Sequence, residues 1–420
     1  MKKTLPGLLI FAITLIPSLL MGFQIKEIAA AKSIFLPPSI AENGKSFVYT
    51  GLDEKTKGPA IFVSCLKSDG TFSTPSAVVT VNSKIEGTSE KFNFFLPLCG
   101  KSSSAGFNSP IIQDNIVTFG ASLKNLKKGV FYAIKENGKW KIFQIAIQGQ
   151  TAPGTNGLKF GNFDAPYITT NSEAIFITSL NNETNVVYAY KIIPGADTSK
   201  NKFSILCKSD RTKSNFFDIS VAAGEFAIPA ESTERIAGKT FMYIFDRKTG
   251  KLIKTVPEKY GQLPKGEKML SRGPSYFGGR IAYTAYTLEN NLHRLIYAIY
   301  TNAGGNVFSQ PFVITGKYYD TINTVFTKVW NPTLYIKDNK AYITFIGHTI
   351  SDSKIMGVYV AIVENGKVTI KAIAVPGQKL SDGRVIQTAA IGAVSIRNGI
   401  VPMALTLEKD ENIIAVAKIF

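Results

Sequence analysis

The segment Gly129–Ile134 reads Gly-Val-Phe-Tyr-Ala-Ile and is soon followed by Asn137-Gly138. A run of β-branched and aromatic residues that ends at Asn-Gly is typical of a strand that turns back on its neighbour, because both central residues of a type I′ turn need positive φ. This strand-and-turn unit recurs along the chain. Its copies are Pro59–Val63 with Asp69-Gly70, Asn185–Tyr190 with Pro194-Gly195, Lys239–Ile244 with Thr249-Gly250, Leu295–Ile299 with Gly304-Gly305, Met356–Val360 with Asn365-Gly366, and Asn412–Val416.

Another strand opens each unit, and a proline often begins it. These first strands recur every ~50 to 70 residues, and four strands at such a period match one blade of a β-propeller. We therefore predict an all-β fold over residues 23–420, a seven-bladed β-propeller of four-stranded antiparallel blades. The first strands begin at Pro38, Pro110, Pro166, Phe217, Pro274, Pro332 and Gly392.

The last unit stops at Phe420, after its third strand. At the other end of the chain, Phe23–Ala29 resembles Ile142–Ile147, the fourth strand of the second unit. We predict that residues 23–31 supply the missing strand and close the ring, which removes exposed strand edges. The alternative is that residues 23–31 are the end of an export signal and that the last blade has three strands.

The amino terminus reads as an export signal. Met1-Lys2-Lys3 is basic and the apolar stretch Leu5–Met21 follows it, which is typical of a secretory signal peptide. Cleavage fits after Gly22 or after Ala31, and an uncleaved anchor is the alternative. We predict a signal peptide over residues 1–22 and a protein exported to the periplasm, the exterior or the surface of a bacterium.

Composition excludes several classes of protein. Hydrophobic residues make up 45% and charged residues 19%, which excludes disordered, collagen-like and disulfide-scaffold chains. Only 2 His and 3 Cys are present, so we predict no metal site, no haem attachment and no cofactor. Cys65 and Cys99 bracket a Gly/Ser-rich stretch and are the candidate disulfide, whereas Cys207 lies in a strand-like run and is expected to be a buried hydrophobic residue.

Two segments, Asn43–Phe47 and Asn171–Phe176, are partial copies of the motif N-x-x-G-x-x-A-F. With its proline-led strands, the chain resembles the bacterial exported tandem-repeat proteins named for that motif. The resemblance implies a propeller-like repeat fold. It implies no activity, because that family is largely uncharacterised.

The formal charge of +18 comes mostly from lysine, and Lys317 and Lys328 have aromatic neighbours. Cations beside stacking rings suit an anionic or carbohydrate polymer, whereas glycoside hydrolysis needs two facing carboxylates. We expect the loops and the central mouth to supply the ligand contacts. The candidates are Asp164, Asp218, Arg272, Tyr318, Tyr319, Asp320 and Trp330.

These features favour an exported, non-catalytic propeller over an enzyme. The expected partner is a protein or an anionic or carbohydrate polymer of the cell envelope or exterior, and export argues against nucleic acid. Contact with a membrane is expected only through an uncleaved signal. The alternatives are a carbohydrate-active hydrolase or lyase with carboxylates at the propeller mouth and, less favoured, a redox propeller.

Overall fold

A computed structural model describes most of the chain from Phe23 onward. The signal peptide predicted over residues 1–22 lies outside the described residues. The described ranges are 23–94, 110–164, 166–181, 184–195, 202–209, 214–216, 220–222, 225–232, 240–246, 248–256, 267–269, 275–277, 279–287, 292–300, 306–349 and 355–420.

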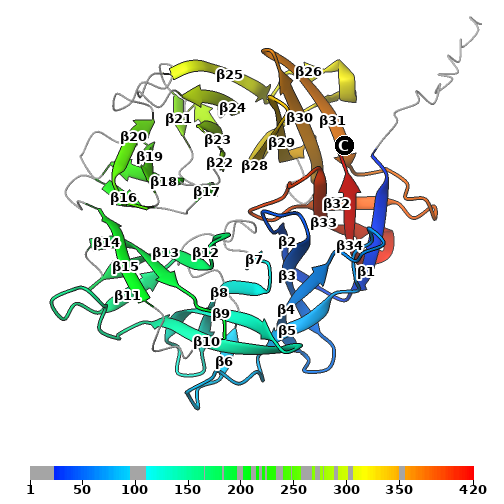
Figure 1. Cartoon of the computed structure of the whole chain (residues 1–420). Helices are drawn as coiled ribbons and strands as arrows, with labels where there is room; N and C mark the ends of the chain where they lie inside the picture. The colour runs from blue at the N-terminus through cyan, green and yellow to red at the C-terminus, as the bar shows by residue number, and fades with distance from the viewer. Residues whose placement is uncertain are drawn as a thin grey trace, which may run out of the picture.

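Seven antiparallel sheets stand around a common centre, as Figure 1 shows, so the predicted seven-bladed β-propeller is confirmed. We letter the strands of each blade a to d, from the centre to the rim. The first strand of blades 2 to 5 is in two pieces. Blades 1 to 3 comprise β2 (Ile34–Ile40), β3 (Ser46–Asp53), β4 (Gly58–Cys65), β5 (Ser76–Thr80); β6 (Phe92–Phe94), β7 (Ile111–Gln113), β8 (Ile116–Leu123), β9 (Lys128–Glu136), β10 (Lys139–Ile147); β11 (Phe160–Phe163), β12 (Tyr167–Ile168), β13 (Glu173–Leu180), β14 (Thr184–Lys191), β15 (Lys202–Lys208).

The remaining blades follow in chain order, with one exception in the last. Blade 7 takes its fourth strand from the amino-terminal end of the chain. Blades 4 to 7 comprise β16 (Ser214–Phe216), β17 (Ser220–Ala222), β18 (Glu225–Ser232), β19 (Thr240–Asp246), β20 (Leu252–Val256); β21 (Glu267–Met269), β22 (Ser275–Phe277), β23 (Arg280–Thr287), β24 (Leu292–Tyr300), β25 (Asn306–Ile314); β28 (Lys328–Lys337), β29 (Lys340–His348), β30 (Gly357–Glu364), β31 (Lys367–Ala374); β32 (Ile386–Ala390), β33 (Ile400–Leu407), β34 (Asn412–Lys418), β1 (Ile25–Ala31).

Local sequence explains the turns and the broken first strands. Asn137 and Gly138, between β9 and β10, both have positive φ, as do Asn365 and Gly366 between β30 and β31. Asn-Gly is favoured there because positive φ has little steric cost for Gly and a smaller cost for Asn than for most other residues. In blade 6 the pairing of β28 is interrupted between Trp330 and Thr333, where Pro332 cannot donate a ladder hydrogen bond.

Strand β1 closes the ring. It pairs antiparallel with β34, from Ile25 opposite Ala417 to Ala31 opposite Asn412. The prediction that residues 23–31 complete the last blade is therefore confirmed, and a three-stranded last blade is not observed. Blades 7 and 1 also meet near the centre, where the Ile40 amide donates to the Val394 carbonyl at 2.8 Å.

Because successive strands of a blade run antiparallel, their turns lie alternately on the two faces of the ring. The a–b and c–d turns lie on one face, which we name the a–b face. The b–c turns and the connections between blades lie on the other, which we name the b–c face. Buried aliphatic and aromatic side chains fill the space between blades. Among the described residues, no helix is long and apolar enough to cross a membrane.

The predicted Cys65–Cys99 bridge is not formed by Cys65, which carries a free thiol. Cys65 ends β4 on the a–b face. The insertion that contains Cys99 follows β6, which pairs with the b–c end of β8. Cys99 itself lies outside the described residues.

Cys207 is a packed residue of β15. Burial raises the pKa of its thiol to about 12, whereas an activated nucleophile would have a lowered thiol pKa.

Candidate functional site

Three of the predicted contact residues, Tyr318, Tyr319 and Asp320, lie on one connection, between blades 5 and 6. It folds as a small hairpin of β26 (Tyr318–Tyr319) and β27 (Thr324–Val325), with the 3-10 turn η2 (Asp320–Ile322) at its tip. Trp330 follows in β28. Tyr319 packs against the core between blades 5 and 6, and Trp330 packs against the core between blades 6 and 7. We use the name lysine–aromatic patch for these residues and the two lysines beside them: Lys317, Tyr318, Tyr319, Lys328 and Trp330.

The hairpin holds its aromatic side chains in different settings. The Tyr319 hydroxyl accepts a hydrogen bond from the Ile314 amide at 2.6 Å, and the ring packs 5.6 Å from that of Phe326. Tyr318 points outward and is 51% exposed. The Lys317 ammonium lies 5.7 Å from the centroid of the Tyr319 ring. One ring is therefore anchored beneath a cation, and its neighbour is open to solvent.

The second half of the lysine–aromatic patch repeats this arrangement. The Lys328 ammonium lies 4.2 Å from the Trp330 ring centroid, within the usual range of a cation–π contact. The Trp330 ring also meets the ring of His348 edge to face, at a centroid distance of 5.0 Å. His348 is buried, so Trp330 is held by the fold and not by solvent-exposed neighbours.

The hairpin is a loop that lies away from the central mouth. The turn η2 contacts β31, the outermost strand of blade 6, so Tyr318, Tyr319 and Asp320 lie toward the rim on the b–c face (Figure 1). The reason is the insertion of residues 316–326, which carries them outward before β28 begins. Asp164 lies apart, between β11 and β12, where its amide donates to the Ile177 carbonyl. Asp218 and Arg272 lie outside the described residues.

At the centre of the a–b face, a buried arginine crosses the propeller axis. Arg397 of blade 7 is 4% exposed and donates to its own strand at Ile396 and to the Leu334 carbonyl of blade 6, at 2.8 and 3.4 Å. Its guanidinium carbon lies 5.6 Å from the ring centroid of Phe277 in blade 5. The Arg397 side chain therefore links blade 7 to blades 6 and 5.

Tyr167 of blade 3 completes this central cluster. Its hydroxyl donates to the Glu42 carboxylate of blade 1 at 3.4 Å, and Arg397 acts on it from the other side. Burial, and next the negative charge of Glu42, raise the pKa of Tyr167 although Arg397 opposes the shift. A phenol held in its neutral form suits packing and hydrogen bonding better than nucleophilic attack.

No local motif marked this cluster in the sequence. Arg397 is the last residue before the a–b turn of blade 7, where it pairs with Ile400. The residues in the same place in blades 2, 5 and 6 are Gln113, Phe277 and Lys337, so a charge at this position is not confined to blade 7. The burial of Arg397 becomes visible only in the folded structure.

Hydrogen-bonded turns link the blades around this centre. The Tyr335 hydroxyl donates to the Asn398 side chain at 2.7 Å, and the Asn398 amide donates to the Asn43 carbonyl at 2.9 Å. Asn43 in turn donates to the Asp114 carboxylate at 2.8 Å. This chain spans blades 6, 7, 1 and 2. The Asp114 carboxylate of blade 2 is therefore engaged in a hydrogen bond that holds the a–b turn of blade 1.

Other turn carboxylates have the same structural use, and each shows a lowered pKa. Hydrogen bonds to the carboxylate from the side chain and then the amide of a turn partner are the main causes. These pairs are Asp69 with Thr71, Asp246 with Thr249, and Asp382 with Arg384; for Asp53 the Thr56 hydroxyl comes first. Among the residues that the structure describes, no group of three His, Cys, Asp or Glu side chains could hold a metal.

These turn acids make stability depend on acid pH. A carboxyl group whose folded pKa lies below its ordinary value of 3.8 stabilises the fold above that pH, and this stability is lost as the pH falls through the folded pKa. We expect the melting temperature to fall between about pH 5 and about pH 2. The double variant Asp69→Asn, Asp246→Asn should show a shallower fall, and an unchanged slope would contradict this account.

Neither a protein-family model nor a curated protein matches the chain. Similar solved structures include the WD40 domain of SCAP from fission yeast, with 12% identity, a TM-score of 0.40, and coverage of 94% of this chain and 98% of that one. The BP39L lectin from Burkholderia pseudomallei has 9% identity and a TM-score of 0.43 over 92% and 96% of the two chains.

Acylaminoacyl peptidase from Pyrococcus horikoshii matches at 14% identity and a TM-score of 0.43, over 74% of this chain. The match covers 45% of the peptidase, so the chain spans less than half of that protein's length. Similarities at these identities and scores carry no argument about activity or ligand. The fold of the present chain rests on its own strand pairings.

Proposed function

We propose that this chain is an exported, non-catalytic binding propeller that recognises an anionic polysaccharide of the bacterial envelope or exterior. The lysine–aromatic patch carries the proposal. It presents two ammonium groups, each beside a ring that the fold supports, and the exposed ring of Tyr318. Aromatic faces stack on sugar rings, while lysine neutralises carboxylate or sulfate groups along the polymer.

Charge supports the same function. The chain carries 48 Lys and Arg against 30 Asp and Glu. Several described acids are already engaged in turns, as with Asp69 and Asp246. The excess lysines therefore create a positive surface that attracts a polyanion over about one Debye length, and this attraction weakens as salt is added.

Binding to the patch is tested with polygalacturonate, a polymer of negatively charged sugars. We expect the protein to bind it, to bind neutral dextran weakly, and to lose affinity as salt rises. The double variant Lys317→Glu, Tyr318→Ala should bind about tenfold more weakly, because it loses one cation and one stacking ring. Affinity is measured by isothermal titration calorimetry.

Lys139→Glu is the control variant. Lys139 is an exposed lysine at the start of β10 in blade 2, so the substitution changes charge by the same amount away from the patch. Equal losses in the two variants would show a diffuse charge effect and would refute a site at the patch.

Export is supported by the sequence of residues 1–22, which is typical of a secretory signal peptide, and the place of β1 bears on where that signal is cut. A cut after Gly22 would leave all of β1 in place, whereas a cut after Ala31 would remove it from blade 7. We propose that the signal is cleaved after Gly22 and that the protein is released beyond the inner membrane. Mass spectrometry of the exported protein should find Phe23 as its first residue, and a first residue of Lys32 would contradict the proposal.

The hydrolase alternative required carboxylates converging at the propeller mouth. Glu42, Tyr167 and Arg397 do converge there, but Tyr167 is 6% exposed and Arg397 only 4%. Hydrolysis needs two carboxyl groups on either side of an accessible bond. The cluster is better suited to hold the blades together, so it does not move the proposal from binding to catalysis.

A further inference from the structure

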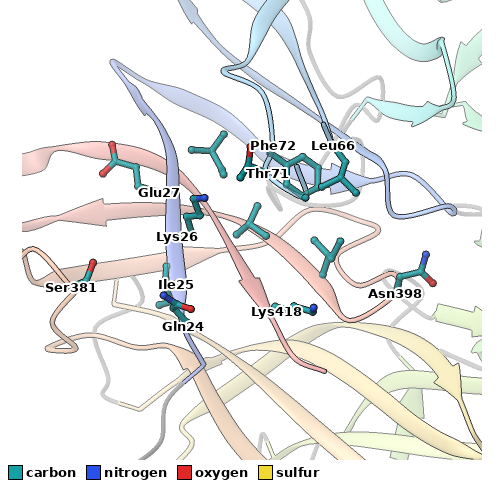
Figure 2. Close-up of a pocket in the computed structure, with 14 residues that line it drawn as sticks. Gln24, Ile25, Lys26, Glu27, Leu66, Thr71, Phe72, Ser381, Asn398 and Lys418 are labelled. Carbon is teal, nitrogen blue, oxygen red and sulfur yellow. The ribbon is translucent and has the colours of Figure 1, made fainter. Parts of the chain in front are cut away.

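The seam between blades 7 and 1 contains a cavity of about 700 Å³, which opens on the a–b face beside the strand that closes the ring. Figure 2 shows β1 on one side of this cavity, with Thr71 and Phe72 of blade 1 on another and Lys418 near the end of β34. We name it the seam pocket; the residues used below are Lys26, Ile28, Leu66, Phe72, Ile400 and Lys418.

The floor of the seam pocket is apolar. Ile28, Leu66 and Ile400 are partly buried and pack against the core cluster that contains Phe72. The Phe72 ring is itself held by Phe47, at a centroid distance of 5.1 Å. A cavity of this size with an apolar floor is typical of small-molecule sites.

The walls are rigid before any ligand binds. The Leu66 amide donates to the Lys45 carbonyl at 2.7 Å, and the Lys67 amide donates to the Thr71 carbonyl at 2.7 Å. On the opposite wall, Lys26 of β1 is paired with Val416 of β34. Preformed walls reduce the entropy lost when a ligand is bound.

The rim carries two cations. Lys26 and Lys418 are exposed, and neither takes part in the ion pairs found between described residues. Nearby acids are engaged elsewhere. Glu27 is paired with Arg384, and Asp69 accepts the Thr71 amide and hydroxyl at 2.8 and 2.6 Å, although Lys26 also acts on it.

We propose that the seam pocket binds an amphipathic carboxylate, with an unbranched hydrocarbon chain on the apolar floor and its carboxylate between Lys26 and Lys418. A neutral apolar molecule would leave both ammonium groups unused, and a highly charged polymer would leave the apolar floor exposed. The site lies on the a–b face, whereas the lysine–aromatic patch lies on the b–c face. The inference is therefore independent of the proposed function.

The test uses dodecanoate below its critical micelle concentration, with calorimetric detection on the purified protein. We expect saturable binding at one site and about tenfold weaker binding in the double variant Lys26→Glu, Lys418→Glu. Dodecyltrimethylammonium, which has the same chain and the opposite charge, should bind far more weakly. Equal binding of the two amphiphiles would overturn the proposal.

Matched variants separate this site from general charge. Lys139→Glu, Lys367→Glu changes the charge equally at two exposed positions, each directly after an Asn-Gly turn, and should bind dodecanoate as the wild type does. The substitution Ile400→Phe narrows the apolar floor of the seam pocket. It should weaken the binding of dodecanoate more than the binding of hexanoate, which has a shorter chain. If Ile400→Phe does not fold, the two lysine pairs still decide the outcome, because all four side chains are exposed. Equal losses in the two lysine pairs would refute the site.

Discussion

Removal of residues 23–31 is expected to lower the free energy of unfolding by about 4 kcal/mol, because each aliphatic side chain buried against its neighbours contributes ~1.5 to 3 kcal/mol. Strand β1 contributes two partly buried isoleucines: Ile25 packs against the core between blades 6 and 7, and Ile28 packs between blades 7 and 1. Its loss also exposes the edge of β34 along the whole paired length. Urea denaturation followed by circular dichroism measures the change.

The control for this deletion is removal of residues 1–22 alone, which leaves β1 intact. This shorter deletion should unfold at the same urea concentration as the full chain. If the two deletions had equal midpoints, β1 would contribute nothing and the ring would be closed by blades 1 and 7 through their inner strands alone. The urea midpoint of a separate variant, Arg384→Ala, should lie between the midpoints of the two deletions, because Arg384 pairs with Glu27 of β1 and with Glu411 of blade 7.

The substitution Gly392→Ala should be nearly as damaging. A Cβ atom at this position would lie 2.6 Å from the Pro38 carbonyl oxygen and 2.8 Å from its carbon, and it would also strike the Ser39 hydroxyl. The Gly392 amide donates to that same carbonyl at 3.0 Å, so blade 7 cannot move away without losing the bond. We expect a loss of about 3 kcal/mol, at the upper end of overpacking effects, in thermal and urea unfolding.

The substitution Ser39→Ala, at the same contact between blades 1 and 7, should instead stabilise the fold. The Ser39 hydroxyl is fully buried and has no hydrogen-bond partner among the residues that the structure describes. Its removal should raise stability by about 1 kcal/mol, because an unsatisfied buried hydroxyl is costly. In the double variant with Gly392→Ala, the collision with the Pro38 carbonyl remains, so most of the loss should persist. Full recovery would show that the hydroxyl alone was the obstacle.

Repetition made the architecture predictable. Each unit repeats the same order of strands and turns, so one ambiguous segment such as Phe217 could be assigned from its neighbours. The closing strand was predictable for a similar reason, since Phe23–Ala29 resembles another fourth strand and the last unit lacked one. These inferences rest on period and pattern, which survive changes in individual residues.

The sites were harder to predict because they depend on where blades meet. Arg397 is close in space to Tyr167 and Phe277, which lie more than a hundred residues before it in the sequence. No local pattern reports such a meeting. Tyr318 was expected in the loops or at the mouth, but no pattern in the sequence showed that the extra residues of its hairpin carry it toward the rim. The seam pocket had no sequence signal, since its walls come from both ends of the chain.

The pairing of β1 with β34 also sets an order of events during synthesis. The ribosome makes β1 before any blade, yet its partner is among the last strands to be made. The first six blades contain all of their own strands. In contrast, β1 lacks backbone hydrogen-bond partners until β34 has been made. We therefore expect the pairing of β1 with β34 to form late in folding, because it joins segments far apart in the sequence. Until it forms, each strand has an unpaired edge that a chaperone or a second copy of the chain could occupy.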